Sequence, residues 1–372
     1  MKYLCLLLLA TSVSCRFTDD LYQLLAKENA DKNLITSPLS VEIALSLAYM
    51  GARGKTAQEM RDVLKLPDDK KEVAAKFKDL LSKLEGRESV AILSLANRIY
   101  VNNKFKLVPE YNQMVKDSFK AEAEAISANN PKITASIVNK WVDTQTSGKI
   151  RDLVMPSDVA NLVLVILNAI YFKGQWQKKF NTEQTKSDFH ISDQKSVPVQ
   201  MMSLVRPFGV SYDRELGANV IELPYRNSNL SMVIFLPDKV DGLPELEKKM
   251  VGFTPKLINI NVHLRLPKFK IEFSARLEQV LIAMGIQDAF KTSADFNDLV
   301  ANSGAHVGGV VHKAFLEVNE EGSEAAAATA VVFRYKSIRS PPMDFNVNHP
   351  FAYVIRDAEN IYFQGHFVNP EL

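Results

Sequence analysis

A nearly unbroken apolar run, LVLVILNAIY from Leu162 to Tyr171, limits most strongly what this chain can fold into. Neighbouring side chains of a strand point to opposite faces of its sheet, so a strand that is apolar at odd and even positions must be covered on both faces. The run therefore predicts a central strand between two layers. Asn168 interrupts it, and a buried amide needs hydrogen-bond partners.

The first part of the chain has the apolar spacing of helices. Leu39, Ile43, Leu47 and Met50 recur at intervals of three or four residues. The stretch 56–59, TAQE, fits a capping box at the start of a second helix. These signals predict two consecutive helices.

Two further helical segments follow. Between residues 68 and 85, lysines alternate with acidic residues, which favours a solvated helix face over a polyanion site. Ile133, Ile137 and Trp141 form an apolar stripe, and Gly148 offers a helix stop.

Strand signals dominate the later part of the chain. Leu230 to Leu236 is a second buried run, and a helix from Arg276 to Met284, ended by Gly285, leads to a last strand from Ile361 to Phe367. Half-buried strands are indicated by alternating apolar residues at Val262, Leu264, Leu266, Phe269, Ile271 and Phe273. Helices followed by strands, with no repeat or linker, indicate one α+β domain.

The chain starts with the layout of a secretory signal peptide. Lys2 precedes an apolar run from Leu4 to Ala10, and small residues follow up to Cys15. We therefore expect a signal peptide over residues 1–15, a mature domain over 16–372, and a secreted, extracellular protein. Both cysteines, Cys5 and Cys15, lie within or at the end of the leader, so the mature chain should contain no internal disulfide.

The net charge and the absence of known motifs exclude several classes of partner and site. A net charge of +2, from 45 basic and 43 acidic residues, does not indicate binding to nucleic acid or to a membrane surface. There is no hydrolase, zinc-peptidase or phosphate-loop motif, and no two histidines have metal-ligand spacing, so we expect neither an enzyme nor a metal or other cofactor. The sequon at Asn229 permits N-glycosylation.

One segment, Glu320 to Pro342, reads EEGSEAAAATAVVFRYKSIRSPP and has signals for three conformations. Four consecutive alanines favour helix, whereas the β-branched residues after them favour strand, and a glycine and paired prolines favour loop. A segment that suits helix, strand and loop about equally well needs an explanation.

Runs spread over nearly the whole mature chain resemble the serpins, a family of serine protease inhibitors, in both order and spacing. They are Thr36 to Ser40, Asn139 to Val142, Thr146 to Ile150, Asn168 to Trp176, His312 to Ala314, Glu317 to Gly322, Asn348 to Phe351 and Phe367 to Pro370. The resemblance implies about three β-sheets, eight to nine helices and an exposed reactive-centre loop over about 320–344. It also implies that a protease cuts the loop, which then inserts into the central sheet and traps the acyl-enzyme.

The loop has the composition of the inhibitory members of the family. In an inserted strand Ser323, Ala325, Ala327, Thr329 and Val331 would face one side, with Glu324 and Ala326 on the other. No proline lies between Gly322 and Lys336 to interrupt a new ladder. The resemblance assigns the hinge to Glu320, Glu321, Gly322, Ser323, Glu324, Ala325, Ala326, Ala327 and Ala328. Non-inhibitory carriers tend to have proline, charge or bulk there, so a carrier remains only an alternative.

Two family counts place the cleaved bond between Lys336 and Ser337. Lys336 lies sixteen positions after Glu320, and also nine before Phe345, as in the similar loop of antithrombin. Lysine suits the negatively charged pocket of trypsin-like proteases. A register shifted by one would instead make Tyr335 the bait for chymotrypsin-like proteases of the chymase or cathepsin G type.

The family also assigns positions outside the loop. Some of these positions lie beneath the sheet, in the shutter, and others lie where the loop enters it, in the breach. Together they are Ser37, Ser40, Asn168, His312 and Trp176. Thr36 and Ala352 depart from common family usage, which concerns local packing. The predicted partners are extracellular serine proteases, preferably trypsin-like, and we expect a monomer that binds neither nucleic acid nor membrane. No motif supports a glycosaminoglycan partner, although the family resemblance is compatible with one. The sequence resembles secreted arthropod members.

Overall fold

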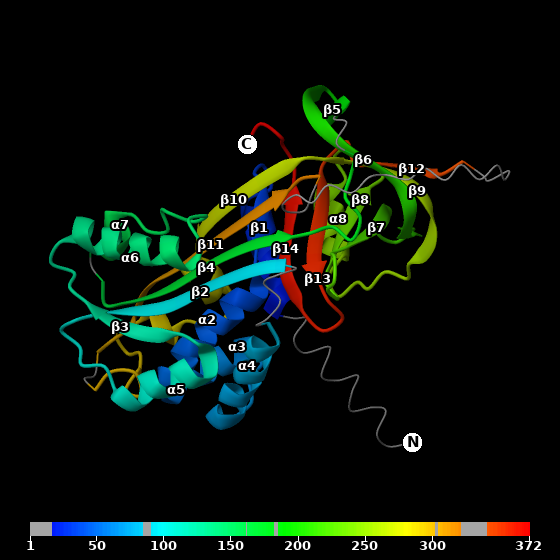
Figure 1. Cartoon of the computed structure of the whole chain (residues 1–372). Helices are drawn as coiled ribbons and strands as arrows, with labels where there is room; N and C mark the ends of the chain where they lie inside the picture. Colours follow the sequence, from blue (N-terminus) through cyan, green and yellow to red (C-terminus); the bar gives the residue numbers. More distant parts are fainter. Residues whose placement is uncertain (1–16, 85–90, 161, 182–184, 302–303, 321–340) are drawn as a thin grey trace, which may run out of the picture.

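The computed structural model describes residues 17–84, 91–160, 162–181, 185–301, 304–320 and 341–372 (Figure 1). The helices within these residues are 17–28, α2 (Pro38–Gly51), α3 (Gly54–Leu64), α4 (Lys70–Leu84), α5 (Pro109–Phe119), α6 (Pro131–Gln145), α7 (Pro156–Val159), α8 (Leu243–Lys249), α9 (Glu278–Met284) and the 3-10 turn η1 (Asp288–Phe290).

The strands form two hydrogen-bonded sheets. They are β1 (Leu34–Thr36), β2 (Ala91–Asn102), β3 (Glu122–Ile126), β4 (Leu164–Gly174), β5 (Thr185–Ser192), β6 (Lys195–Asp213), β7 (Ala218–Pro224), β8 (Ser231–Pro237), β9 (Ile258–Pro267), β10 (Phe269–Arg276), β11 (Val307–Val318), β12 (Met343–Asn346), β13 (Phe351–Arg356) and β14 (Ile361–Phe367). The smaller sheet has the order β10-β11-β4-β2-β3. The larger has the order β1-β14-β13-β8-β7-β6-β9-β12, with β5 on β6. The α+β prediction is confirmed. Among the described strands there are two hydrogen-bonded sheets where about three were expected, because the 19-residue β6 pairs with β5, β7 and β9 and so joins parts of the larger sheet.

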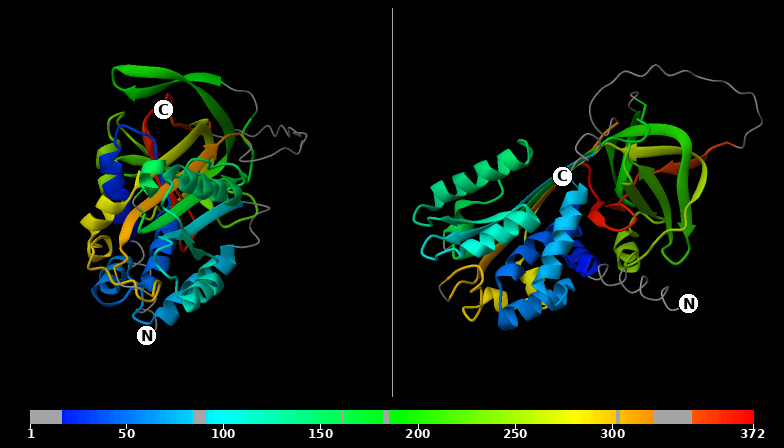
Figure 2. Two further views of the ribbon diagram at one scale, coloured as in Figure 1. Left: turned by 90° about the vertical axis from the view of Figure 1, so that its left-hand side faces the viewer. Right: turned by 60° about the horizontal axis from the view of Figure 1, so that its bottom comes forward.

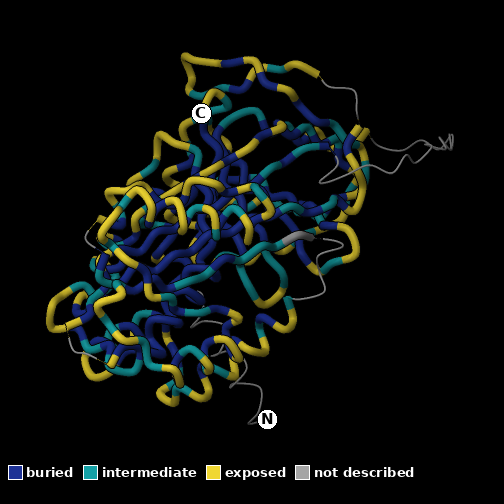
Figure 3. The backbone as a smooth tube through the Cα atoms, turned by 60° about the vertical axis from the view of Figure 1, so that its left-hand side comes forward, coloured by how far each residue is buried: buried dark blue, intermediate teal, exposed yellow. Residues whose placement is uncertain are grey.

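Strand β4 is covered on both faces, as its sequence predicts. Its even-numbered apolar residues, such as Ile166 and Ile170, belong to the main core, to which α2 also contributes. Its odd-numbered residues, such as Leu167 and Tyr171, belong to a second core under α6. Figure 2 shows α6 and the α2–α4 helices on opposite sides of this sheet. Buried backbone runs through the interior of the molecule, and exposed residues lie on the outer helices and turns (Figure 3).

The predicted capping box at 56–59 is wrong, because both of its side chains have tertiary partners. The residue that precedes α3 is Arg53, which makes no side-chain cap. The Thr56 hydroxyl donates to Asp288 Oδ2 at 2.5 Å. The Glu59 carboxylate accepts the backbone N–H groups of Gln287 and Asp288, each at 2.7 Å. Thr56 and Glu59 therefore anchor α3 to η1 and do not cap the start of the helix.

The predicted apolar stripe on α6 is wrong at Ile133 and Ile137, whereas its third member, Trp141, is partly buried against the second core. Ile133 and Ile137 are 57% and 45% exposed. The face that packs on the sheet carries smaller residues, namely Thr134, Ala135, Val138 and Val142. Small side chains let the helix lie close to the strands, and periodicity alone could not show which of two adjacent faces is buried. The other predicted helix, from Arg276, starts two residues late at Glu278, because Arg276 is the last residue of β10.

Lys70, Lys76 and Lys83 of α4 form ion pairs within the protein. Lys83 pairs with Asp79 on the exposed face at 2.8 Å, which fits the predicted solvated face. Lys76 pairs with the buried Glu42 of α2 at 2.7 Å, and Lys70 pairs with Asp298 at 2.9 Å. Two of these lysines therefore hold α4 to the body of the molecule.

Within the described residues, no cluster of three or more histidine, cysteine or acidic side chains could hold a metal ion. Nor is any helix there both long and apolar enough to cross a membrane. The buried His366 has a structural environment, since its Nδ1 lies 2.6 Å from Glu247 Oε1 and its Nε2 lies 2.9 Å from the Lys32 carbonyl oxygen.

Candidate functional site

The candidate site lies where β4 and β11 meet in the five-stranded sheet. These two strands are parallel neighbours, and each has an antiparallel strand on its other side. Glu320 follows the end of β11, and the chain reaches the other sheet at β12 (Figure 1). The segment between them contains the predicted reactive-centre loop.

Most of the predicted loop residues lie outside the described part of the chain. They are Glu321, Gly322, Ser323, Glu324, Ala325, Ala326, Ala327, Ala328, Tyr335, Lys336 and Ser337. The hinge and the cleaved bond therefore stay predictions. What the structure describes is the sheet into which the loop would insert and both attachment points of the loop.

A ladder of polar side chains crosses three strands at the centre of this sheet. Asn97, Asn168 and His312 stand opposite one another on β2, β4 and β11. The Asn168 amide nitrogen donates to Asn97 Oδ1 at 2.5 Å, and its Oδ1 lies 2.5 Å from His312 Nδ1. These bonds to Asn97 and His312 supply the hydrogen-bond partners that the buried Asn168 amide requires. The bond to His312 joins the two strands that would have to separate to admit a third.

The surroundings of His312 fix its tautomer. Its Nε2 faces the backbone N–H of Ser37 at 3.3 Å and therefore accepts a hydrogen bond, so Nδ1 carries the proton and donates to Asn168. Complete burial lowers the pKa of His312 to about 3. The unfolded chain binds a proton here below about pH 6.5, so the stability from the neutral ring is complete above that pH and is lost as pH falls toward 3.

The start of α2 supplies the floor beneath this ladder. Ser40 Oγ and the Ser40 carbonyl both accept from the Asn168 amide. The Ser37 hydroxyl caps α2 by accepting the Ser40 N–H, and Thr36 Oγ1 lies 3.4 Å from His312 Nε2. The structure thus brings Ser37, Ser40, Asn168 and His312 together. Thr36, which departs from family usage, takes part through its hydroxyl.

Trp176 lies apart from this group, just beyond the end of β4. Its ring is buried and stacks on Tyr225 with 4.6 Å between centroids. Its indole N–H donates to the Asn319 carbonyl at 2.8 Å, immediately before the loop. Gly174 is required beneath this stack, because a Cβ there would lie 2.6 Å from the Tyr225 ring. Trp176 therefore holds the chain where the loop leaves the sheet.

Glu320, the first predicted hinge residue, is anchored at both its backbone and its side chain. Its carbonyl accepts the Phe180 N–H at 3.0 Å. Its largely buried carboxylate lies 3.1 Å from the ammonium of Lys268, which sits between β9 and β10. Together these contacts fix the point from which the loop departs.

Reversing the charge at this anchor should loosen it. We expect Glu320→Lys to lower the unfolding temperature by about 4 °C, because an ammonium would face Lys268 and losing a partly buried pair costs about 2 kcal/mol. The double variant Glu320→Lys/Lys268→Glu should recover at least half of that loss in thermal unfolding. Lys256→Glu, at an exposed site, is the charge-matched control. A double variant no better than the sum of the singles would contradict a direct pair.

Sequence reasoning missed Asn97, Tyr225 and Lys268. Asn97 interrupts the apolar residues of β2 as Asn168 does in β4, and that signal could have found it. Nothing in the sequence near Tyr225 or Lys268 marks them, because both act through residues more than forty positions away.

Comparisons with known proteins agree with this architecture. The family model described as serpin (serine protease inhibitor) matches residues 12–370. Serine protease inhibitor 42Dd of Drosophila melanogaster is 50% identical, with 100% of each chain covered. Among solved structures, Serpin48 of the insect Tenebrio molitor has a TM-score of 0.88 at 33% identity, covering 96% of this chain and 97% of that one. Human thyroxine-binding globulin, in complex with its hormone, has a TM-score of 0.88 at 27% identity, with 97% and 98% covered. The chain therefore belongs to the serpin family and is a serine protease inhibitor, not an enzyme.

Proposed function

We propose that this protein is a secreted suicide inhibitor of trypsin-like serine proteases, cleaved between Lys336 and Ser337. The observation that carries the proposal is the parallel pairing of β4 and β11, with the bait segment continuing directly from β11. A segment that folds back from the end of β11 would run antiparallel to both strands. It would thereby replace one parallel pairing by two antiparallel ones, which are slightly more stable per residue.

The two cores explain the composition of the loop. Residues nearest Glu320 would meet the carboxyl ends of β4 and β11, where the α6 side carries the partly exposed Lys173 and Glu317. Glu324 can face water there. Later residues would enter beneath α6, between two apolar cores, and the run from Ala325 to Val332 is small or apolar at every position.

The proposed chemistry is an interrupted hydrolysis. The protease serine oxygen attacks the Lys336 carbonyl carbon, the bond to the Ser337 nitrogen breaks, and that nitrogen leaves with a proton from the protease histidine. Lys336 remains joined to the protease as an ester. Insertion then carries the protease across the sheet before water can cleave the ester, and the energy comes from the new ladder, on the order of 10 kcal/mol for about a dozen residues.

Two specific observations define the alternatives. Tyr335 adjoins Lys336, and its use would redirect the inhibitor to chymotrypsin-like proteases. A hormone-binding relative shares the fold with a TM-score of 0.88, so the fold alone does not separate inhibitor from carrier. Between Ser323 and Ala328, the residues that would face the core of an inserted strand are small (Ser323, Ala325 and Ala327), which favours the inhibitor.

Denaturing gels after incubation with trypsin and with chymotrypsin test the proposal. We expect a band at the summed mass with trypsin and a released fragment that begins at Ser337. A fragment that begins at Lys336 would move the bait to Tyr335. Clean cleavage by both enzymes without a stable complex would overturn inhibition in favour of a carrier. Expression with the chain's own leader tests secretion, and gel filtration tests the proposed monomer.

A further inference from the structure

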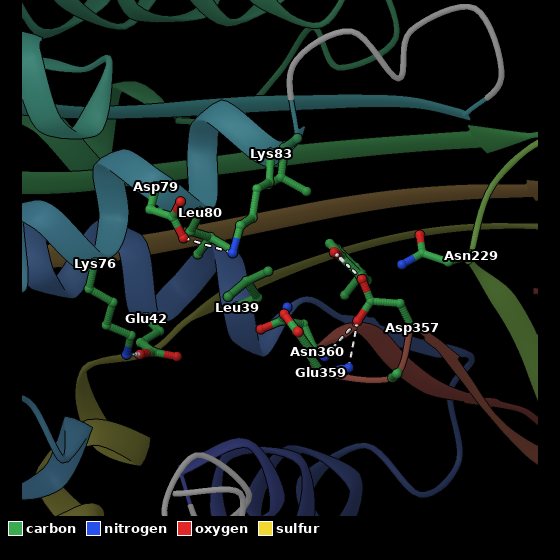
Figure 4. Close-up of a pocket in the computed structure, with 13 residues that line it drawn as sticks. Leu39, Glu42, Lys76, Asp79, Leu80, Lys83, Asn229, Asp357, Glu359 and Asn360 are labelled. Atoms are coloured by element: carbon green, nitrogen blue, oxygen red, sulfur yellow. Dashed lines mark hydrogen bonds and ion pairs between the residues drawn. The ribbon is translucent and has the colours of Figure 1, made fainter. Parts of the chain in front are cut away.

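A cavity of about 410 Å³ separates α4 from the turn between β13 and β14 (Figure 4). This volume falls within the range of small-ligand sites. The cavity lies outside the loop machinery, because none of Asn97, Asn168, His312 and Trp176 lines it.

The lining combines apolar and polar groups. Leu39, Leu80 and Leu84 supply the apolar part. Charged groups line the cavity on both sides. On the α2 and α4 side these are the ion pairs Lys76–Glu42 and Lys83–Asp79, and on the β13–β14 turn they are Asp357 and Glu359. Such a lining suits a carbohydrate, which has apolar ring faces and many hydroxyl groups that donate and accept hydrogen bonds.

The sequon residue Asn229 is itself part of this lining. It is exposed, in the turn between β7 and β8, and its amide points toward the Asp357 turn across the cavity (Figure 4). The turn is well held, because the Tyr225 N–H donates to the Leu230 carbonyl at 2.9 Å and Ser231 Oγ donates to Glu222 at 2.8 Å. A sugar linked to Asn229 would therefore start at a residue that lines the cavity.

We propose that Asn229 is N-glycosylated and that the first N-acetylglucosamine of this glycan occupies the cavity. Its apolar face and acetamido methyl group pack on the leucines of α2 and α4, and its polar groups reach Lys83 and the 357–360 turn. The glycan then joins α4 to the β13–β14 hairpin. This inference rests on the proposed passage through the secretory pathway.

The test uses the full chain, expressed with its own leader in insect cells under a mannosidase inhibitor, so that the glycans are of the high-mannose type. Intact mass and peptide mapping locate the glycan. Hydrogen–deuterium exchange then compares three samples: the untreated protein, the protein trimmed by endoglycosidase H to one N-acetylglucosamine, and the Asn229→Gln variant. We expect amides of the 357–360 turn to exchange at least about threefold more slowly in the first two than in the third.

A displaced glycan provides the matched control. Asn261→Thr in the Asn229→Gln background creates a sequon at the exposed Asn259 of β9, which does not line the cavity. That glycan should leave the turn unprotected. Secretion without a glycan at Asn229, or equal exchange in all samples, would overturn this inference alone. If the protein is retained inside the cell, both the glycan inference and the proposed secretion are overturned. Complex formation with trypsin is assayed separately.

Discussion

Replacing Ser323 by arginine should turn the inhibitor into a substrate. In an inserted strand Ser323 belongs to the uncharged set of alternate residues, which would face the main core between the sheet and α2. Of the carboxylates near that end of β11, Glu320 is paired with Lys268 and Glu317 lies on the α6 side. The guanidinium would therefore be buried without a partner, and burying an unpaired charge costs several kcal/mol. A rise of about 3 kcal/mol in the free-energy barrier to insertion slows trapping about a hundredfold. Hydrolysis of the ester would then be faster than insertion.

The matched control is Glu324→Arg, one residue further along. That side chain would face the opposite side, near the partly exposed Glu317. We expect about one inhibitor consumed per trypsin for the wild type and for Glu324→Arg, and at least about ten for Ser323→Arg. Equal stoichiometries for the two arginine variants would show that the loop does not insert in the proposed register.

Replacing Asn168 by alanine should destabilise the native protein and release the pair of central strands. The change leaves the buried His312 Nδ1–H without its acceptor and removes the bonds to Ser40. An unsatisfied buried group together with lost packing costs about 3 kcal/mol, which lowers the unfolding temperature by about 6 °C. Uncleaved protein should also convert more quickly to a loop-inserted form, which native gels can follow during incubation at moderate temperature.

Asn97→Ala is the control for this prediction. It removes one hydrogen bond to Asn168 but none that crosses from β4 to β11. We expect less than half the loss of stability and no faster conversion. If both variants converted at the same rate, the bridge to His312 would not be what holds β4 and β11 together.

Local patterns were enough to predict the elements whose burial depends on their own sequence. The run at Leu162 predicted β4 with apolar cover on both faces, and Ile361 to Phe367 predicted the bounds of β14. Asn168, which interrupts this apolar run, indicated a buried hydrogen-bond network. The family resemblance predicted His312, Ser37 and Ser40 as its other members.

The errors arose where a distant segment decided the outcome. Thr56 binds Asp288 rather than its own helix end, a choice that depends on where η1 lies. On α6, the sheet selects the smaller Ala135 and Val138 face and leaves Ile133 exposed, because closeness of approach matters more than hydrophobicity. The Lys268–Glu320 pair joins two loops that no local pattern relates.

The second core under α6 bears directly on the proposed insertion. Val138 and Val142 pack over the part of β4 and β11 that a late loop segment would enter, and Lys313 of β11 donates to the Asp152 carbonyl oxygen, in the segment after that helix, at 2.8 Å. If the loop inserts as proposed, tighter packing of α6 would slow the spontaneous conversion of unused inhibitor, and looser packing would shorten the interval in which a captured protease can still escape. The small-residue face of one helix would then set both the storage lifetime of the inhibitor and the rate at which it traps its target.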